Sequence, residues 1–152
     1  MPAPLIDAIL PNNDEHRRWA LRELRGRLGD LDGRRITVLG LAYTAGTSAT
    51  RRSVGIEMCR ELLAAGASVM AFDPLVSALP PVFAAVELSH IMEDACARAE
   101  AVVVATEWPE FRRLTADSFT HGNGPPTVID QPGWLASMLG ADSRVHYVRF
   151  GV

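Results

Sequence analysis

The sequence predicts an α/β protein built on a doubly wound parallel sheet of about six strands, in the order 3-2-1-4-5-6. β-rich apolar runs alternate with helical patterns along the whole chain, as parallel βαβ units with right-handed crossovers require. The length of 152 residues, with 48% hydrophobic and 22% charged residues, is typical of one globular domain. We therefore expect one sheet-bearing domain in residues 34–152, preceded by a linker helix in residues 1–33.

The first predicted element is this N-terminal helix. Asn12 is a candidate N-cap, and Glu15 follows it at the spacing of a capping box. Leu21, Leu24 and Leu28 recur at helical spacing and form one apolar stripe. The stripe either folds onto the chain's own sheet or is partly exposed. We expect self-association, as a homodimer, or docking on a partner through this helix rather than a monomer.

The first half of the domain predicts a strand, a helix and a second strand. Residues 35–42 are a β-rich run that stops at a loop of small residues. Ser53 is expected to cap a helix that runs through Ala65 and is closed by Gly66. Residues 67–72 form the second strand, and Asp73-Pro74 ends it.

The second half repeats the alternation with shorter segments. The apolar run at residues 101–106 is unbroken, as expected for a strand covered on both faces. The other elements expected in order are a short strand near 83–86, helices at 88–98 and 111–119, a strand at 127–129, a short helix at 134–139 and a last strand at 145–150.

Composition excludes several classes of function. The net charge of −3 and the pI of about 5.8 give no electrostatic footprint for nucleic acid. No apolar run approaches the ~18 residues of a membrane span, and the first residues do not form a signal peptide. All 15 basic residues are Arg, which excludes a catalytic lysine. Cys59 and Cys96 are interpreted as reduced core thiols of a cytoplasmic protein, and the four histidines show no metal spacing.

The order of several segments resembles the C-terminal domain of the UDP-glucose/GDP-mannose dehydrogenase family. Gly40-Leu41-Ala42-Tyr43, followed by Thr47, Arg51 and Ser53, is similar to that family's Gly-Leu-Ala-Phe-Lys…Thr…Arg…Ser signature. Thr106-Glu107-Trp108 with Phe111 is similar to its Thr-Glu-Trp-x-x-Phe segment, and Val128-Ile129-Asp130 to the strand before its last loop. The resemblance covers almost the whole chain. It implies a Rossmann-like domain that binds the nucleotide of a nucleotide sugar.

The complete enzyme of that family has three parts and oxidises the C6 hydroxyl of the sugar with two NAD and a cysteine nucleophile. This sequence contains neither the cysteine motif nor a G-x-G-x-x-G fingerprint. We therefore expect a nucleotide-sugar-binding domain that is not an active dehydrogenase alone and holds no cofactor by itself. Thr44 and Pro132 stand where the family has a Lys and an Arg, which removes two cations from the expected ligand site.

The candidate binding residues lie at the carboxyl ends of the predicted strands, where open α/β sheets bind ligands. For several of these residues a purely structural role is the alternative to ligand binding. Arg51 and Arg52 either hold an anion or are solvated, Asp73 either takes ribose hydroxyls or forms a turn, and Trp108 either stacks on a base or packs on its loop. The full set is Tyr43, Thr44, Thr47, Arg51, Arg52, Ser53, Asp73, Glu107, Trp108 and Gln131.

Two classes of function remain open. The first is a nucleotide-sugar-binding module. The second is a small enzyme that reuses the same crevice for acid–base chemistry, such as an isomerisation, dehydration or cyclisation in a biosynthetic pathway. Its candidate catalytic groups are Asp73, Glu107, Asp130 and Tyr43. Nucleotide binding by the isolated chain would distinguish the two classes.

Overall fold

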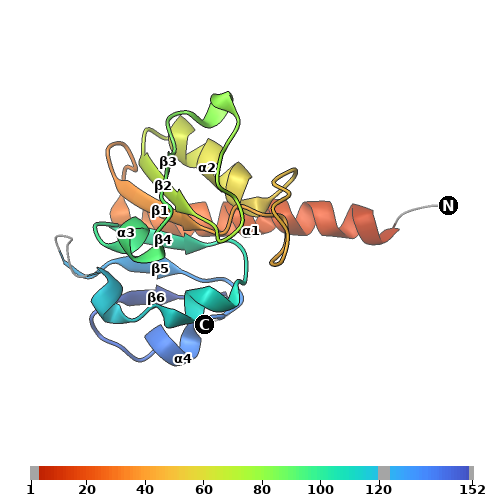
Figure 1. Cartoon of the computed structure of the whole chain (residues 1–152). Helices are drawn as coiled ribbons and strands as arrows, with labels where there is room; N and C mark the ends of the chain where they lie inside the picture. The colour runs from red at the N-terminus through yellow and green to blue at the C-terminus, as the bar shows by residue number, and fades with distance from the viewer. Residues whose placement is uncertain (1–3, 120–123, 151–152) are drawn as a thin grey trace.

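A computed structural model describes residues 4–119 and 124–150, with side chains in the first helix described for residue 15 and from residue 17 onward. It contains a six-stranded sheet in the order β3-β2-β1-β4-β5-β6, in which every neighbouring pair is parallel. The sheet crosses the molecule from β3 to β6 in Figure 1. This confirms the predicted fold class and strand order. The strands are β1 Arg35–Leu39, β2 Ser68–Phe72, β3 Glu87–Leu88, β4 Ala101–Val104, β5 Thr127–Ile129 and β6 His146–Val148.

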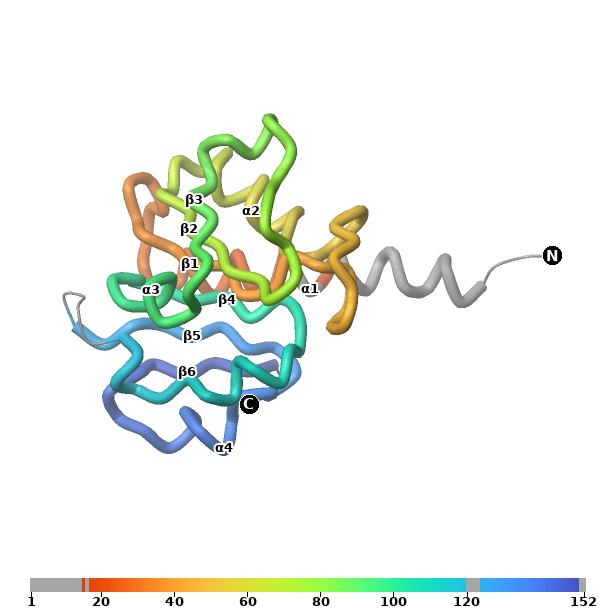
Figure 2. The backbone as a smooth tube through the Cα atoms, in the orientation of Figure 1, coloured from red at the N-terminus to blue at the C-terminus, as the bar shows by residue number. Residues whose placement is uncertain are grey.

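Helices cover both faces of the sheet. The two long ones, α1 (Pro4–Leu28) and α2 (Val54–Ala64), lie behind the sheet in Figures 1 and 2. The short α3 (Met92–Cys96) lies in front of it, and α4 (Ala136–Leu139) lies beside β6 at the lower end of the same view. Within the described part of the chain, no helix is both long and apolar enough to cross a membrane. Three 3-10 helices complete the fold, at Pro81–Phe83, Pro109–Arg113 and Ala116–Phe119.

Helix α1 begins at Pro4, so the prediction that Asn12 caps it was wrong. Proline at a first helical position is favoured because its φ is already helical and its missing N–H would have no partner there. The apolar stripe of α1 faces the chain's own sheet: Leu21 and Leu24 are buried in the core, and Leu28 packs against it. Of the two alternatives for this stripe, the structure shows the one that covers the sheet.

The segment between β2 and β4 differs from the sequence prediction. The strand expected near residues 83–86 lies at Glu87–Leu88, and the helix expected at 88–98 is reduced to α3. Ser89 is the physical reason, because its Oγ accepts a hydrogen bond from the Ile91 amide at 3.2 Å and donates one to the Ile91 carbonyl at 2.8 Å. Such a turn holds the backbone away from helical geometry until Met92.

Two other segments are shorter than expected. The helix predicted at 111–119 consists of two 3-10 helices, which place Phe111 and Phe119 in the core. The first of these helices starts at Pro109. The helix expected at 134–139 starts two residues later, at Ala136. In contrast, Ser53 caps α2 as predicted, with its side chain accepting the Ile56 amide at 3.1 Å.

Close packing of β1 against α2 and β4 depends on two glycines. Gly40 has φ +95° and lies so close to Thr106 that an added Cβ would be 2.6 Å from the Thr106 Cβ. An added Cβ on Gly55 would lie 1.9 Å from the carbonyl oxygen of Gly40. Only glycine fits at such contacts. The first turn of α2 is thereby held directly against the carboxyl end of β1.

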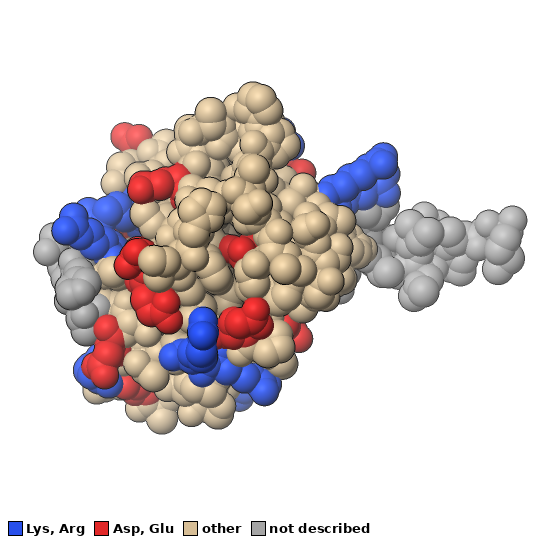
Figure 3. All heavy atoms as spheres, in the orientation of Figure 1, with Lys and Arg blue, Asp and Glu red and all other residues tan. Residues whose placement is uncertain are grey.

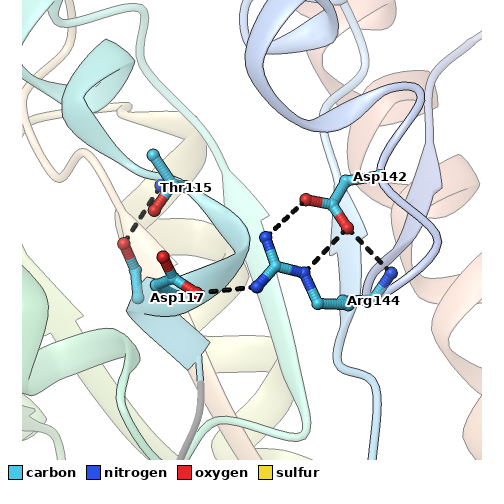
Figure 4. A network of polar contacts seen from close by, with 5 residues as sticks. Thr115, Asp117, Asp142 and Arg144 are labelled. Atoms are coloured by element: carbon cyan, nitrogen blue, oxygen red, sulfur yellow. Dashed lines mark hydrogen bonds and ion pairs between the residues drawn. The ribbon is translucent and has the colours of Figure 1, made fainter.

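An exposed ion-pair network joins two segments in the second half of the chain. Figure 4 shows Arg144 contacting Asp142 and Asp117, with its guanidinium 2.7 Å from Asp117 Oδ1 and 2.9 Å from Asp142 Oδ2. The side-chain hydrogen bond from Arg144 lowers the pKa of the Asp142 carboxyl below its usual value. The network connects the 3-10 helix at Ala116–Phe119 to the loop before β6. Because it is exposed, its contribution to stability is small.

Both cysteines are free and buried, as predicted. Cys59 lies on α2 and Cys96 on α3, which cover opposite faces of the sheet. Burial raises the pKa of each thiol to about 12. A thiol in this state is a poor nucleophile at neutral pH, so neither cysteine is a candidate catalytic group.

We predict that Gly55→Ala lowers the free energy of unfolding by about 3 kcal/mol, because the added methyl group collides with the Gly40 carbonyl. Gly26→Ala is the control, since this exposed position in α1 has no heavy atom within 4 Å of the added Cβ. It should stabilise the protein by roughly 0.5–1 kcal/mol. Urea denaturation followed by circular dichroism measures both changes. Equal midpoints for Gly55→Ala and the unsubstituted chain would contradict the proposed contact.

Candidate functional site

The candidate site is the edge of the sheet where the strands end at their carboxyl termini. In the observed order β1 lies beside β4, and the crossovers that leave these two strands go to opposite sides. This is the switch point at which open α/β sheets bind ligands. Three features meet there: a buried carboxylate at the end of β2, a loop with two arginines after β1, and an apolar crevice above β4 and β5.

The buried carboxylate is Asp73, which is 5% exposed. Its Oδ2 accepts the backbone amides of Leu41 and Ala42 at 2.7 and 2.9 Å, and its Oδ1 accepts those of Leu75 and Val76 at 2.8 and 3.1 Å. The second pair is an Asx turn. The first pair fixes the chain just beyond β1. Asp73 therefore holds the ends of β1 and β2 together, and its acceptor positions are occupied by the protein.

Trp108 belongs to the same cluster. It is buried, and its indole Nε1 donates to Asp73 Oδ2 at 3.3 Å. Its carbonyl accepts the indole of Trp134 at 3.0 Å, and the guanidinium of Arg112 lies 3.7 Å from the Trp134 ring centroid. The Trp108 ring is therefore buried and hydrogen-bonded to the end of β2.

The loop between β1 and α2 carries the exposed cations. It is closed by a hydrogen bond from the Tyr43 amide to the Ala49 carbonyl at 2.7 Å. Within the described residues, Arg51 and Arg52 form no ion pair, and both are exposed. Arg52 has φ +59°, a conformation that side-chain-bearing residues rarely adopt. An open cavity of about 750 Å³, the loop cavity, is lined by Tyr43, Thr44, Thr47, Ala49, Arg51 and Arg52.

An apolar crevice of about 360 Å³ lies beside this loop, between α1, α2 and the ends of β4 and β5. Its two hydrogen-bonding side chains are those of Glu107, which is exposed, and Gln131. Phe150 forms part of the wall, is 60% exposed and makes an edge-to-face contact with Trp19 at a centroid distance of 5.6 Å. The remaining lining residues are Ala20, Val54, Met58, Val103, Val104, Ala105, Ile129 and Pro132.

Asp130 lies at the end of β5 and is fully buried. Its Oδ2 accepts the Leu135 amide at 2.6 Å and the Tyr147 hydroxyl at 2.5 Å, while its Oδ1 has no partner among the described residues. Burial, together with the hydrogen bond to Asp130, raises the pKa of the Tyr147 hydroxyl well above its usual value. Asp130 does not line the crevice. Its contacts support the loop that connects β5 to α4.

The predicted site residues thus fall into three groups. Glu107 and Gln131 line the crevice, and Tyr43, Thr44, Thr47, Arg51 and Arg52 line the loop cavity. Asp73, Trp108 and Ser53 are buried in contacts with the protein itself. Sequence reasoning missed Phe150 and the residues of α1 and α2 in the crevice. The available signal is the aromatic residue at the end of the run 145–150, which the sequence predicts to belong to the last strand.

No group of three or more metal-ligating side chains occurs among the described residues. Of the histidines, His90 and His146 are exposed, and the side chains of His16 and His121 lie outside the described part of the chain. Figure 3 shows acidic and basic side chains scattered among one another on the face in view, without a continuous basic surface there.

Comparison with known proteins gives one matching family model. Residues 37–136 match the UDP-binding domain of the UDP-glucose/GDP-mannose dehydrogenase family. The chain is 40% identical over 111 residues to the UDP-glucose 6-dehydrogenase AglM of Haloferax volcanii, covering 72% of this chain and 26% of that protein. It is 32% identical over 142 residues to a UDP-glucose 6-dehydrogenase of Rickettsia bellii, covering 91% and 32%. The chain therefore spans a third or less of these relatives.

Solved structures show the same relationship. A UDP-glucose dehydrogenase from the hyperthermophilic archaeon Pyrobaculum islandicum matches with a TM-score of 0.71 and 32% identity, over 82% of this chain and 28% of that one. A GDP-mannose dehydrogenase from Pseudomonas aeruginosa matches with a TM-score of 0.65 over 96% and 34%, and at 17% identity it supports the fold alone.

We predict that Asp73→Asn lowers the free energy of unfolding by about 3 kcal/mol, because an amide nitrogen would face backbone N–H groups that now donate to a carboxylate. Glu107→Gln is the matched control at an exposed position, and its change should stay within about 0.5 kcal/mol. Chemical denaturation of both variants measures the difference. Equal stability of the two variants would show that Asp73 does not hold the strand ends together.

Proposed function

The chain belongs to the UDP-glucose/GDP-mannose dehydrogenase family, to whose UDP-binding domain it corresponds, and we propose that it binds the nucleotide of a UDP-sugar at the carboxyl edge of its sheet. The observation that carries the proposal is the crevice beside the loop with Arg51 and Arg52. A volume of about 360 Å³ is within the range of small-molecule sites. Unpaired, exposed arginines next to it suit phosphate groups.

The expected affinity is modest. Arg51 and Arg52 are the basic residues of the loop cavity, and the crevice itself contains no cation. Thr44 and Pro132 are neutral where the family has cations, and each missing charge-assisted hydrogen bond costs roughly 1.5–3 kcal/mol. We propose that, because these two residues are neutral, the phosphates contribute less of the binding energy and the apolar crevice contributes more. The crevice then favours an uncharged group of the ligand.

The residues present do not fit NAD, the coenzyme that the family implies. The turn after β1 reads Gly40-Leu41-Ala42 rather than the dinucleotide fingerprint. Asp73, which occupies the position of a ribose-binding acid, already accepts four backbone amides and one indole N–H. We therefore propose that this chain contributes nucleotide-sugar binding, and that coenzyme binding and oxidation require residues outside it.

The second candidate, an enzyme using acid–base chemistry in the same crevice, receives less support. Two of its three carboxylates, Asp73 and Asp130, are buried and accept hydrogen bonds from the protein itself. Glu107 and Tyr43 are exposed, and they line different cavities. An acid and a base that act on one substrate must lie within hydrogen-bond reach of it. Among these four described candidates no such pair lines one cavity, and the binding proposal requires none.

We separately propose that the chain associates with a partner, or with a second copy of itself, through α1. Because Leu21 and Leu24 are buried against the sheet, a partner would contact the opposite face of α1, where Arg18, Arg22 and Arg25 are exposed. Two copies meeting through this face would bring like charges together, so such a dimer should be weaker at low ionic strength and stronger when salt screens the arginines. Light scattering at two salt concentrations tests this: a 16.5 kDa species under both conditions contradicts the dimer.

Calorimetric titration with UDP, UDP-glucose and GDP-mannose tests the proposed function. We predict that UDP and UDP-glucose bind with a Kd below roughly 100 μM, which corresponds to about −5.5 kcal/mol. Arg51→Ala should weaken UDP binding about tenfold or more, because it removes a charge-assisted contact to phosphate.

The control is Arg98→Ala, which removes an exposed arginine near the amino ends of the strands, where it lines a different cavity. It should leave UDP affinity unchanged. If none of the three ligands binds, the nucleotide-binding proposal is wrong, and the alternative of an enzyme using acid–base chemistry gains support. If both arginine substitutions weaken binding equally, the ligand is held by net charge and not at this site.

A further inference from the structure

We propose that the chain has a second binding site, at the amino ends of β1 and β2, for a small zwitterion. The ligand carries a carboxylate and an ammonium group at the two ends of a short carbon chain. The site is a cavity of about 440 Å³ bordered by these two strands, β3 and α3. It is independent of the proposed nucleotide site, which lies at the opposite edge of the sheet.

The cavity exists because one face of the sheet is incompletely covered. Met70 pairs with Thr37 of β1 and with Glu87 of β3, so the side chains of all three point to the same face. The Thr37 hydroxyl donates to the Ala95 carbonyl, which makes this the face that α3 covers. Parallel sheets are usually buried on both faces. Helix α3 has only five residues, and Met70 beneath this face is left half-buried.

Charged side chains of both signs border this cavity. Arg35 and Arg98 are the cations, Glu87 and Asp94 are the anions, and all four are exposed. Within residues 4–119 and 124–150, none of the four forms an ion pair. A molecule with one positive and one negative group could pair with both kinds of side chain at once.

The two arginines provide the place for the carboxylate. The Nε of Arg35 donates to the Arg98 carbonyl at 2.9 Å, which directs its guanidinium toward the segment after α3. Glu100 does not occupy this guanidinium, because its carboxylate accepts the Arg35 amide at 2.8 Å and pairs with Arg34 at 3.1 Å. The amide hydrogen bond holds the pKa of Glu100 below its usual value. The terminal nitrogens of Arg35, with the guanidinium of Arg98, can therefore hold a carboxylate.

The two acids provide the place for the ammonium group, which has three N–H donors. Glu87 begins β3, and Asp94 lies on α3. Two strand spacings and two residues separate Arg35 from Glu87 in the register of the sheet, so their Cα atoms lie about 12 Å apart. An α-amino acid carries both charged groups on one carbon and cannot contact both ends of the cavity. An ω-amino acid can.

The rest of the lining suits a carbon chain. Met70, Ala95 and Ala99 contribute apolar side chains to the cavity. Its volume of about 440 Å³ falls within the range of small-molecule sites. Apolar contact between two charged ends favours a ligand of this kind over separate hydrated ions.

Titration of the isotopically labelled chain with ε-aminohexanoate, followed by amide chemical shifts, tests the proposal. We predict saturable shifts at Arg35, at Ser68 and in residues 94–99, with a Kd of roughly 1 mM. Three matched compounds should bind about fivefold more weakly or less, because each loses one charged contact. Hexanoate lacks the ammonium group, hexylamine lacks the carboxylate, and norleucine is an isomer with both groups on one carbon.

Variants test the same contacts from the side of the protein. Asp94→Asn and Arg98→Ala should each weaken binding of ε-aminohexanoate about threefold. Glu93→Gln is the matched control for the acid, since Glu93 is exposed on the same helix and does not line the cavity. Arg113→Ala is the control for the arginine, at an exposed position of another segment. Both controls should change the Kd by less than about twofold, and circular dichroism checks that each variant is folded.

The proposal is overturned if ε-aminohexanoate shifts no amide around this cavity, or if hexanoate, hexylamine or norleucine binds as tightly. It is also overturned if Asp94→Asn and Glu93→Gln have equal effects, because net charge alone would then explain the binding. None of these outcomes bears on UDP, which is titrated separately and is proposed to bind at the other edge of the sheet.

Discussion

The carboxyl edge of the sheet depends on one buried carboxylate. Asp73 accepts hydrogen bonds from the chain after β1, from its own turn after β2 and from the indole that follows β4. A carboxylate in a site that is 5% exposed is favourable only when such donors surround it. The interaction therefore fixes three strand ends relative to one another. The loop cavity begins at Tyr43, directly after the Ala42 amide that Asp73 accepts.

Closely packed contacts and an exposed loop lie side by side at this edge of the sheet. Gly40 and Gly55 bring α2 against the end of β1, so the helix begins at a fixed place beside the crevice. Beyond these contacts, the loop with Arg51 and Arg52 is exposed and contains a backbone angle that is unfavourable for a non-glycine residue. The domain thus combines a mostly apolar crevice, whose one charged lining residue is Glu107, with an exposed loop that carries two arginines. This division suits a ligand with one uncharged ring and one charged end.

The sequence was sufficient for the architecture and only partly sufficient for the site. Strand order followed from alternation and apolar runs such as residues 101–106, because parallel crossovers allow few topologies. Local hydrogen bonds that override periodicity were harder to foresee: the Ser89 turn shortens the helix expected at 88–98, and Pro109 starts a 3-10 helix. At the carboxyl edge, the sequence named residues that line both cavities but did not predict the contact between Asp73 and Trp108. Phe150 was missed because it reaches the crevice through tertiary packing with Trp19 on α1.

The central claim is that this chain binds a nucleotide at the carboxyl edge of its sheet without help from other domains. An amide chemical-shift map of the isotopically labelled chain, recorded with and without UDP, tests it most directly. We expect the largest shifts in the loop after β1, at Glu107 and at Gln131, with a saturable dependence on UDP concentration. Shifts confined to the opposite edge, around Arg35, Ser68 and Asp94 where a second cavity lies, would show that UDP does not bind at the carboxyl edge.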